Sequence, residues 1–189
     1  PVYAEEATPL YAETDGCRSI VSLRSVGENA FVGAYRGMKV SLAYRAVGER
    51  LDIEISIENK TDRPFSPDIF ALKLFPDTYM ASYPAWNRQF FPTFLRCEAT
   101  HFYGYFMTPE GRMLGMGCSE AIPAYKYNFN YHTEGYGHRI YQAELHLLHG
   151  GALPARYPKI AAIAPGEVLS RTISFFPVES LDTFEKEVS

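Results

Sequence analysis

Hydrophobic and polar residues alternate strictly along residues 51–58. The hydrophobic positions are Leu51, Ile53, Ile55 and Ile57, and the polar positions are Asp52, Glu54, Ser56 and Glu58. A period of two is that of an extended strand with one buried and one solvated face. Asn59 and Asp62 then favour an Asx-type turn, and Pro64 has no N–H to donate to a ladder. The segment therefore predicts an outer strand of an antiparallel sheet, with its polar face in solvent and any partner docked elsewhere.

Two β-hairpins are predicted from paired alternating runs. Residues 38–45 have Met38, Val40, Leu42 and Tyr44 on one face, and a turn at residues 47–49 leads from them into the strand at 51–58. A second hairpin joins residues 102–107 to residues 113–118. In its turn Pro109 sets the first central position and Gly111 supplies a positive φ.

The remaining elements complete an all-β pattern. Strands are expected at residues 18–24, 30–34, 69–75, 124–131 and 168–176. Residues 140–148 also fit a short helix, but their neighbours favour a strand, and residues 76–101 resemble a long ordered loop. Only residues 181–188 have a helical pattern, with Ser180 as a plausible cap. We predict a two-sheet antiparallel β-sandwich, supersandwich-like, over residues 1–178, with a helical tail or linker at 179–189.

Composition fits one β-rich domain and weakens several partner classes. The 189 residues are 47% hydrophobic and 15% aromatic, with 14 Gly and 13 Pro, which is typical of strands joined by many turns. A net charge of −4 without basic runs disfavours nucleic acid and anionic membranes as partners. No apolar run is long enough to span a bilayer. Because Pro1 is not an initiator methionine, we expect a processed chain or an excised fragment whose signal peptide is missing, which leaves a secreted or periplasmic location open.

Motifs with a defined chemistry are few. Cys17, Cys97 and Cys118 have no CxxC spacing, and three cysteines allow at most one disulfide, so three separate thiols are favoured. The sequence contains no P-loop, nucleophile elbow, zinc-protease helix or dinucleotide glycine motif. No cofactor is therefore expected.

The histidines supply the weak catalytic and metal candidates. His132 and His138 flank Glu134, so these three residues are candidates for proton transfer at a sugar. An exposed, solvated loop is the competing interpretation. His146 and His149 are three residues apart and can share a metal only if residues 140–149 are helical, because on a regular strand they point to opposite faces.

The aromatic residues supply the candidate ligand site. Trp86 and Arg88 lie in the proline-rich loop, and Tyr125, Tyr127, Tyr131 and Tyr136 form a second group. Flat aromatic rings match the C–H faces of sugars, and an arginine can bind their hydroxyls or carboxylates. Packing in the core or against another domain is the competing interpretation, and the alternation along residues 124–131 favours it.

Three stretches together resemble a known family of β-sandwiches. They are the strand and turn at 51–64, the hairpin at 104–117 with its Pro-Glu-Gly-Arg turn, and the Pro-Gly-Glu followed by a strand within 164–176. This pattern is similar to the galactose mutarotase-like β-sandwich domain that precedes an (α/α) barrel in bacterial glycoside hydrolases and polysaccharide lyases. The resemblance implies an ancillary domain that packs on a C-terminal catalytic domain, with the helical tail as the linker. The histidine and glutamate pair of true mutarotases does not map onto this sequence.

Three functional hypotheses follow. The first is a noncatalytic β-sandwich domain of a larger carbohydrate-active enzyme, with the Trp86 loop or the Tyr125–Tyr136 region facing the partner domain or a polysaccharide or oligosaccharide. The second is a free-standing carbohydrate-binding module. The third is a small sugar-processing enzyme that uses His132, Glu134 or His138.

Overall fold

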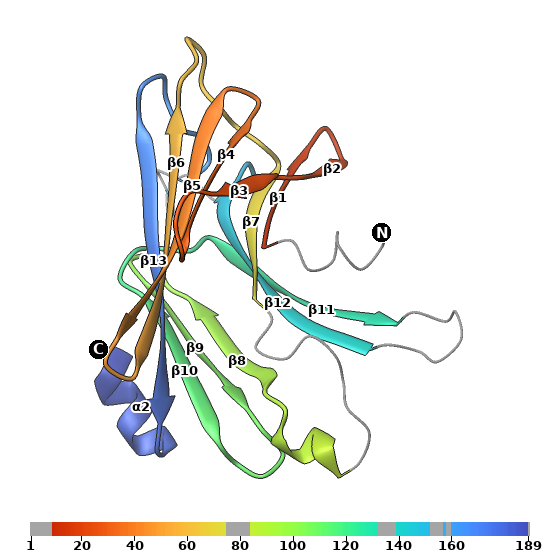
Figure 1. The fold of residues 1–189 in the computed structure, drawn as a ribbon, viewed down its shortest axis with the longest axis vertical. Helices are drawn as coiled ribbons and strands as arrows, with labels where there is room; N and C mark the ends of the chain where they lie inside the picture. Colours follow the sequence, from red (N-terminus) through yellow and green to blue (C-terminus); the bar gives the residue numbers. More distant parts are fainter. Residues whose placement is uncertain (1–8, 75–83, 132–138, 152–156, 158–159, 189) are drawn as a thin grey trace.

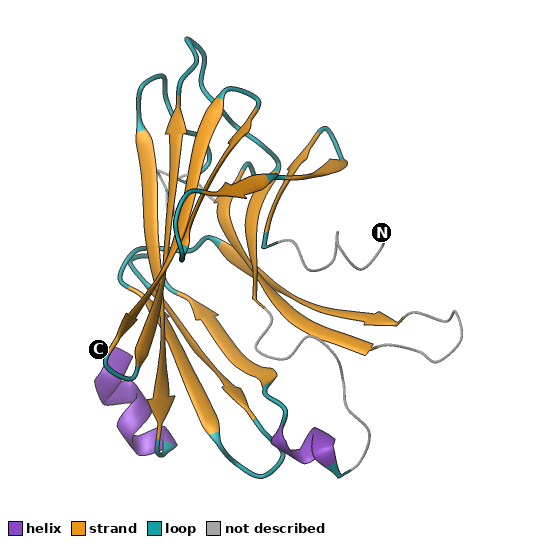
Figure 2. Ribbon diagram, in the orientation of Figure 1, coloured by secondary structure: helices purple, strands orange, loops and turns teal. Residues whose placement is uncertain are grey.

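The chain folds into a two-layer β-sandwich, as the alternating patterns predict. The computed structural model describes residues 9–74, 84–131, 139–151, 157 and 160–188. In these residues a five-stranded and an eight-stranded antiparallel sheet pack face to face (Figure 1). Within the same residues, helix is confined to η1 (Ala85–Arg88) and α2 (Leu181–Val188) (Figure 2).

The two sheets differ in size and in strand order. The small sheet runs β11 (Ala124–Tyr131), β12 (Arg139–His149), β7 (Ile69–Leu74), β1 (Leu10–Thr14) and β2 (Cys17–Ile20). The large sheet runs β3 (Leu23–Ser25), β4 (Ala30–Tyr35), β5 (Met38–Val47), β6 (Arg50–Asn59), β13 (Val168–Val178), β10 (Met113–Cys118), β9 (Phe102–Met107) and β8 (Phe91–Cys97). Both predicted hairpins are confirmed, as β5–β6 and β9–β10.

The core lies between the inner faces of the two sheets. The small sheet contributes Leu72 and Leu145, the large sheet contributes Ile55 and Ile173, and all four are buried. Each such side chain stabilises the fold by about 1.5–3 kcal/mol through burial. The run of β7, in which Lys73 alone interrupts hydrophobic residues, follows from its place in the middle of the small sheet, between β12 and β1.

The prediction of an outer strand at residues 51–58 is wrong. β6 lies inside the large sheet, hydrogen-bonded to β5 on one side and to β13 on the other. Its predicted solvent face is also wrong in part, because Asp52 is only 5% exposed and Glu54, Ser56 and Glu58 are half-buried. Alternation reports which face of a strand is polar, but it does not report how many neighbours the strand has.

Two further sequence predictions need correction. The predicted strand at 18–24 is divided: β2 belongs to the small sheet and β3 to the large sheet, so the chain crosses between layers at residues 21–22. The predicted long loop at 76–101 contains η1 and the edge strand β8 within its described part. The strand assignment for residues 140–148 is confirmed as β12.

The helical tail packs on the sandwich through one aromatic residue. Phe184 of α2 is 3% exposed, and its ring lies 5.4 Å from Tyr105 and 6.1 Å from Tyr103 on β9, centroid to centroid. The backbone N–H of Ser180 donates to Thr183 Oγ1 at 3.3 Å in the first turn. The tail therefore covers part of the outer face of the large sheet. Neither helix in the described part of the chain is long and apolar enough to span a bilayer.

Asn59 ends β6 with four side-chain hydrogen bonds in a fully buried position. Its Oδ1 accepts from the N–H and the hydroxyl of Thr61, at 2.9 and 2.7 Å, which is the predicted Asx turn. Its Nδ2 donates to the carbonyls of Arg63 at 2.7 Å and Ile163 at 2.9 Å. The side chain thereby joins the end of β6 to the segment that precedes β13.

We predict that Asn59→Asp destabilises the chain by about 2–4 kcal/mol. Aspartate keeps the shape and the two accepted bonds, but it loses both donors and directs a buried carboxylate at two carbonyl oxygens. Urea unfolding followed by circular dichroism measures the free energy of unfolding. Thr61→Val is the control, since it removes only the hydroxyl bonds and should cost about 1 kcal/mol. Equal stability of wild type and Asn59→Asp would contradict the assigned role.

Candidate functional site

The structure separates the two predicted aromatic groups. Trp86 is half-buried in η1, and Arg88 at the end of the same helix is exposed and lies 3.9 Å from Glu110. Tyr125 and Tyr127 lie on β11, at the edge of the small sheet. The two groups therefore belong to different elements.

Tyr125 and Tyr127 form an exposed pair on the inner side of β11. They are 38% and 44% exposed, and their rings meet edge to face at 5.4 Å. Their cross-strand partners are Leu145 and Ala143 of the core, so the pair lies on the core-facing side of the sheet. Partial burial, followed by the neighbouring Tyr125, raises the pKa of Tyr127 to about 12. The Tyr127 hydroxyl is therefore a neutral hydrogen-bonding group at neutral pH.

The other predicted site residues receive no structural support. Tyr131 lies on β11, and its side chain is outside the described residues. His132, Glu134, His138 and Tyr136 are also outside the described residues. The proton-transfer candidates therefore stay a prediction.

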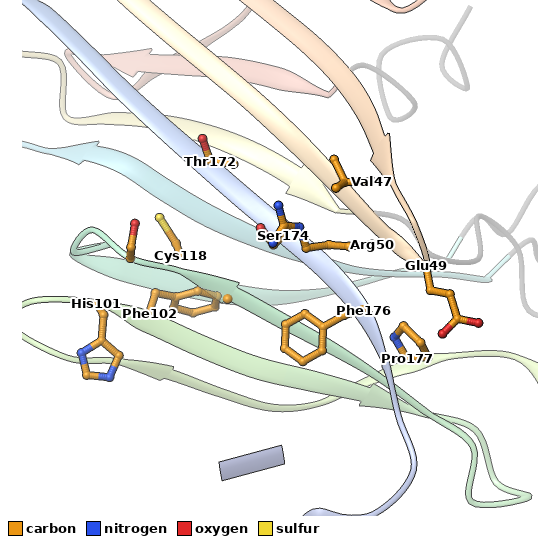
Figure 3. Close-up of a pocket in the computed structure, with 12 residues that line it drawn as sticks. Val47, Glu49, Arg50, His101, Phe102, Cys118, Thr172, Ser174, Phe176 and Pro177 are labelled. Carbon is orange, nitrogen blue, oxygen red and sulfur yellow. The ribbon is translucent and has the colours of Figure 1, made fainter. Parts of the chain in front are cut away.

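A groove of about 640 Å³ opens on the outer face of the large sheet (Figure 3). Thr172, Ser174 and Phe176 of β13 line it, and they alternate with Ile173 and Phe175, whose side chains are in the core. Further lining comes from the β5–β6 turn, the start of β9 and the end of β10, and includes Glu49, Arg50, His101 and Gly117. The volume falls within the range of small-molecule sites. We call this region the outer groove.

An arginine, an aspartate and a serine form the polar wall of the outer groove. Arg50 donates to Asp52 through Nε at 2.9 Å and through Nη2 at 3.0 Å. Ser174 Oγ donates to Asp52 Oδ1 at 2.6 Å. Burial opposes ionisation of Asp52, but the hydrogen bonds from Ser174 and Arg50 outweigh it and hold the pKa of Asp52 below its usual value. The carboxylate stays charged and orients the guanidinium.

Strand β10 pairs with β13 beside the outer groove, and Gly117 of β10 is part of the groove lining. Gly117 pairs with Ser174 across the ladder, and Gly115 pairs with Phe176. A Cβ at Gly115 would lie 2.4 Å from the Phe176 ring, so the ring can lie over this strand only because residue 115 is glycine. Figure 3 shows Arg50 beside Ser174, with His101 and Glu49 on opposite sides of the lining residues. At Gly117 the lining is thus backbone, and the polar side chains of His101 and Glu49 lie on opposite sides of it.

The sequence analysis did not single out the outer groove. One local signal was present, because Arg50 and Asp52 are two residues apart on a strand and so share a face. Their partner Ser174 is 122 residues from Asp52, a pairing that periodicity does not predict. Cys118 also lines the groove. Burial raises the pKa of its thiol to about 12, so it remains protonated and is a poor nucleophile. None of the three cysteines forms a disulfide, as predicted.

A second polar cluster lies on the outer face of the small sheet. Tyr11 donates to Glu144 Oε2 at 2.7 Å, and both residues are buried. Arg18 lies 3.7 Å from Glu144 and 4.0 Å above the centre of the Tyr11 ring. Burial and then the bond to Glu144 raise the pKa of Tyr11. This cluster is a closed ion-pair network with its central groups out of solvent.

His146 and His149 meet although they lie on a strand. The β12–β7 register shifts between His146 and Leu148, which marks a bulge, and the two rings are 5.3 Å apart. The bulge places both rings on one face, so the prediction that they point to opposite faces is wrong. His149 Nδ1 accepts from the Gly151 N–H at 3.0 Å, so Nε2 carries the proton in the neutral ring. In the described residues no three His, Cys, Asp or Glu side chains are grouped to hold a metal ion.

Comparisons with known proteins find similarity of fold. No family model matches the chain, and no curated protein matches its sequence. A polysaccharide lyase structure matches 95% of this chain with a TM-score of 0.68 and 15% identity, over 26% of the lyase. An Escherichia coli K12 protein, provisionally described as an aldose 1-epimerase, matches 89% of this chain and 78% of its own at 15% identity, with a TM-score of 0.49. A chondroitinase AC lyase matches 88% of this chain and 24% of its own at 8% identity, with a TM-score of 0.41.

The chain thus spans about a quarter of the polysaccharide lyase that it matches. At this identity the likeness concerns the fold alone. It confirms the predicted resemblance to a β-sandwich domain of carbohydrate-active enzymes.

We predict that His146 makes the chain less stable as the pH falls. His146 is 6% exposed, and both its ring nitrogens lack a hydrogen-bond partner. Burial, followed by the positive charge of His149, lowers its pKa to about 4. The ordinary histidine pKa is about 6.5. Between about pH 6.5 and about pH 4, His146 is therefore protonated in the unfolded chain and neutral in the folded chain. The stability is complete above about pH 6.5 and falls as the pH drops toward about 4, by about 3 kcal/mol in total.

Unfolding by urea at about pH 7 and about pH 4.5 tests this expectation. His146→Leu should lose clearly less stability than wild type between the two values, while the control His101→Leu, at a half-buried histidine of the other sheet, should behave like wild type. The same pH-dependent loss in wild type and His146→Leu would refute the assignment.

Proposed function

We propose that the chain is a noncatalytic β-sandwich domain of a larger carbohydrate-active enzyme and that it packs on a catalytic domain of the same polypeptide. The supporting observation is the fold shared with a polysaccharide lyase, which covers 95% of this chain but only 26% of the lyase. In such a protein the remaining length has room for a separate catalytic domain.

The edge of the small sheet is the proposed contact surface. Among the strands of the described residues, β11 is the edge of the small sheet, and it displays Tyr125 and Tyr127. Large exposed aromatics and a free strand edge are both features that proteins usually cover. A catalytic domain seated there buries the two rings. The small-enzyme alternative requires His132, Glu134 or His138, none of which lies in the described residues.

Activity and hydrogen exchange test this proposal. We expect the complete gene product to cleave a polysaccharide and the 189-residue chain alone to lack that activity. Hydrogen exchange in β11 should be slower in the complete product than in the isolated chain, while the β3–β4 turn serves as the control. A gene that encodes no further domain, or equal exchange in β11, would contradict the proposal.

A second candidate is a free-standing carbohydrate-binding module, which the exposure of the Tyr125–Tyr127 pair favours. Stacking of one ring on a sugar contributes about 1 kcal/mol. Tyr127→Ala should then weaken glycan binding, measured on a glycan array and by calorimetry, by roughly three- to tenfold. Val168→Ala, which removes exposed apolar surface from the other sheet, should have no effect. Unchanged affinity in Tyr127→Ala would eliminate this contact.

A further inference from the structure

We propose that the outer groove is a second carbohydrate site and that it takes a neutral hexose segment of a glycan. This inference rests on the proposed function, since it names a substrate class for the same domain. It places the ligand on the large sheet, away from the tyrosine pair of β11.

The guanidinium of Arg50 is oriented before any ligand arrives. Two of its five N–H groups donate to Asp52, which leaves three for a ligand. Asp52 is 5% exposed and is itself held by Ser174, whereas the Arg50 side chain is 49% exposed. A buried carboxylate therefore fixes an accessible donor array, and such preorganisation lowers the entropic cost of binding.

The groove matches a sugar in polar and apolar character. Arg50 donates, the Glu49 carboxylate accepts, and the hydroxyl of Thr172 can do either. Phe176, half-buried between Gly115 and Phe184 of α2, adds apolar surface to the lining beside these polar groups. A pyranose has the same combination of vicinal hydroxyls and apolar C–H faces. The volume of about 640 Å³ is sufficient for a short oligosaccharide segment.

Local charge selects a neutral sugar over an acidic one. The charge of Arg50 is balanced by Asp52, and Glu49 adds a negative charge to the lining. His101 bonds through Nδ1 to Thr100 and stacks on Tyr103 at 5.6 Å, so it contributes a polar edge. A carboxylate or sulfate on the ligand would meet no unbalanced positive charge in this lining. The groove therefore favours hydroxyl recognition.

Calorimetric titration of the 189-residue chain tests the proposal. The probes are cellotetraose, mannotetraose and galactotetraose, with a galacturonate tetramer as the acidic comparison. At least one neutral tetrasaccharide should bind, and Arg50→Gln should weaken that binding by about tenfold or more, since charged hydrogen bonds are lost. Arg96→Gln is the matched control, because Arg96 is also an exposed arginine paired with a carboxylate, Glu98, on the large sheet, but lies outside the groove lining.

A second variant distinguishes the loss of the Arg50 donors from a loss of folding. Arg50→Lys keeps the charge but lacks the planar donor array, so it should fold like wild type and still bind less tightly. Circular dichroism confirms folding of each variant. The proposal is overturned if no neutral tetrasaccharide binds, if only the galacturonate tetramer binds, or if Arg50→Gln binds as tightly as wild type. Loss of binding in Tyr127→Ala with no change in Arg50→Gln also overturns it.

These results are separable from those on the proposed function. A gene product without a catalytic domain contradicts the proposed function and leaves the calorimetry of the isolated chain unaffected. Failure of every neutral tetrasaccharide to bind contradicts the carbohydrate site in the outer groove. It leaves the hydrogen-exchange and activity measurements on the complete gene product unaffected.

Discussion

The amide of Asn59 sets the register on which the large sheet and its groove depend. A buried amide must satisfy its donors and acceptors, and Asn59 does so with the turn that follows β6 and with the carbonyl of Ile163 before β13. Its backbone also pairs with Gly166 and Glu167 at the start of that strand. From this point β13 pairs with β6 residue by residue until Ser174 stands opposite Asp52. A slip of one residue would turn Ser174 into the core.

The large sheet and the small sheet each contain a carboxylate paired with an arginine, but the two pairs differ in accessibility. Glu144 is fully buried and takes its hydrogen bond from buried Tyr11. Asp52 is buried too, yet its arginine borders an open groove. Because desolvation offsets most of the attraction in a buried pair, the Glu144 pair contributes little net stability. The Asp52 pair also orients Arg50, and it leaves three N–H groups of the guanidinium for a ligand.

Local periodicity was sufficient to predict the sandwich and its hairpins. The alternation in β5, β6 and β11 depends only on which face is buried, and that information lies within a few residues. The place of β6 inside its sheet depends on its pairing with β13. The burial of Asp52 depends on Ser174 of that strand, which is distant from Asp52 in the sequence. The meeting of His146 and His149 depends on a bulge, which adds one residue and breaks the period on which the prediction relied. Aromatic alternation is local and predicts that Tyr125 and Tyr127 share one face of β11, whereas the outer groove joins four separate segments.

The two accessible surfaces belong to different sheets, and this separation bears on how the domain would work. The outer groove opens on the outer face of the large sheet, whereas Tyr125 and Tyr127 lie on β11. Figure 1 shows β11 at the edge of the small sheet. A domain that packs through β11 keeps its groove open to solvent. Under the proposed function, glycan held in the groove would be tethered near the catalytic domain at a raised effective concentration. Binding and cleavage would then occur on different surfaces of one polypeptide.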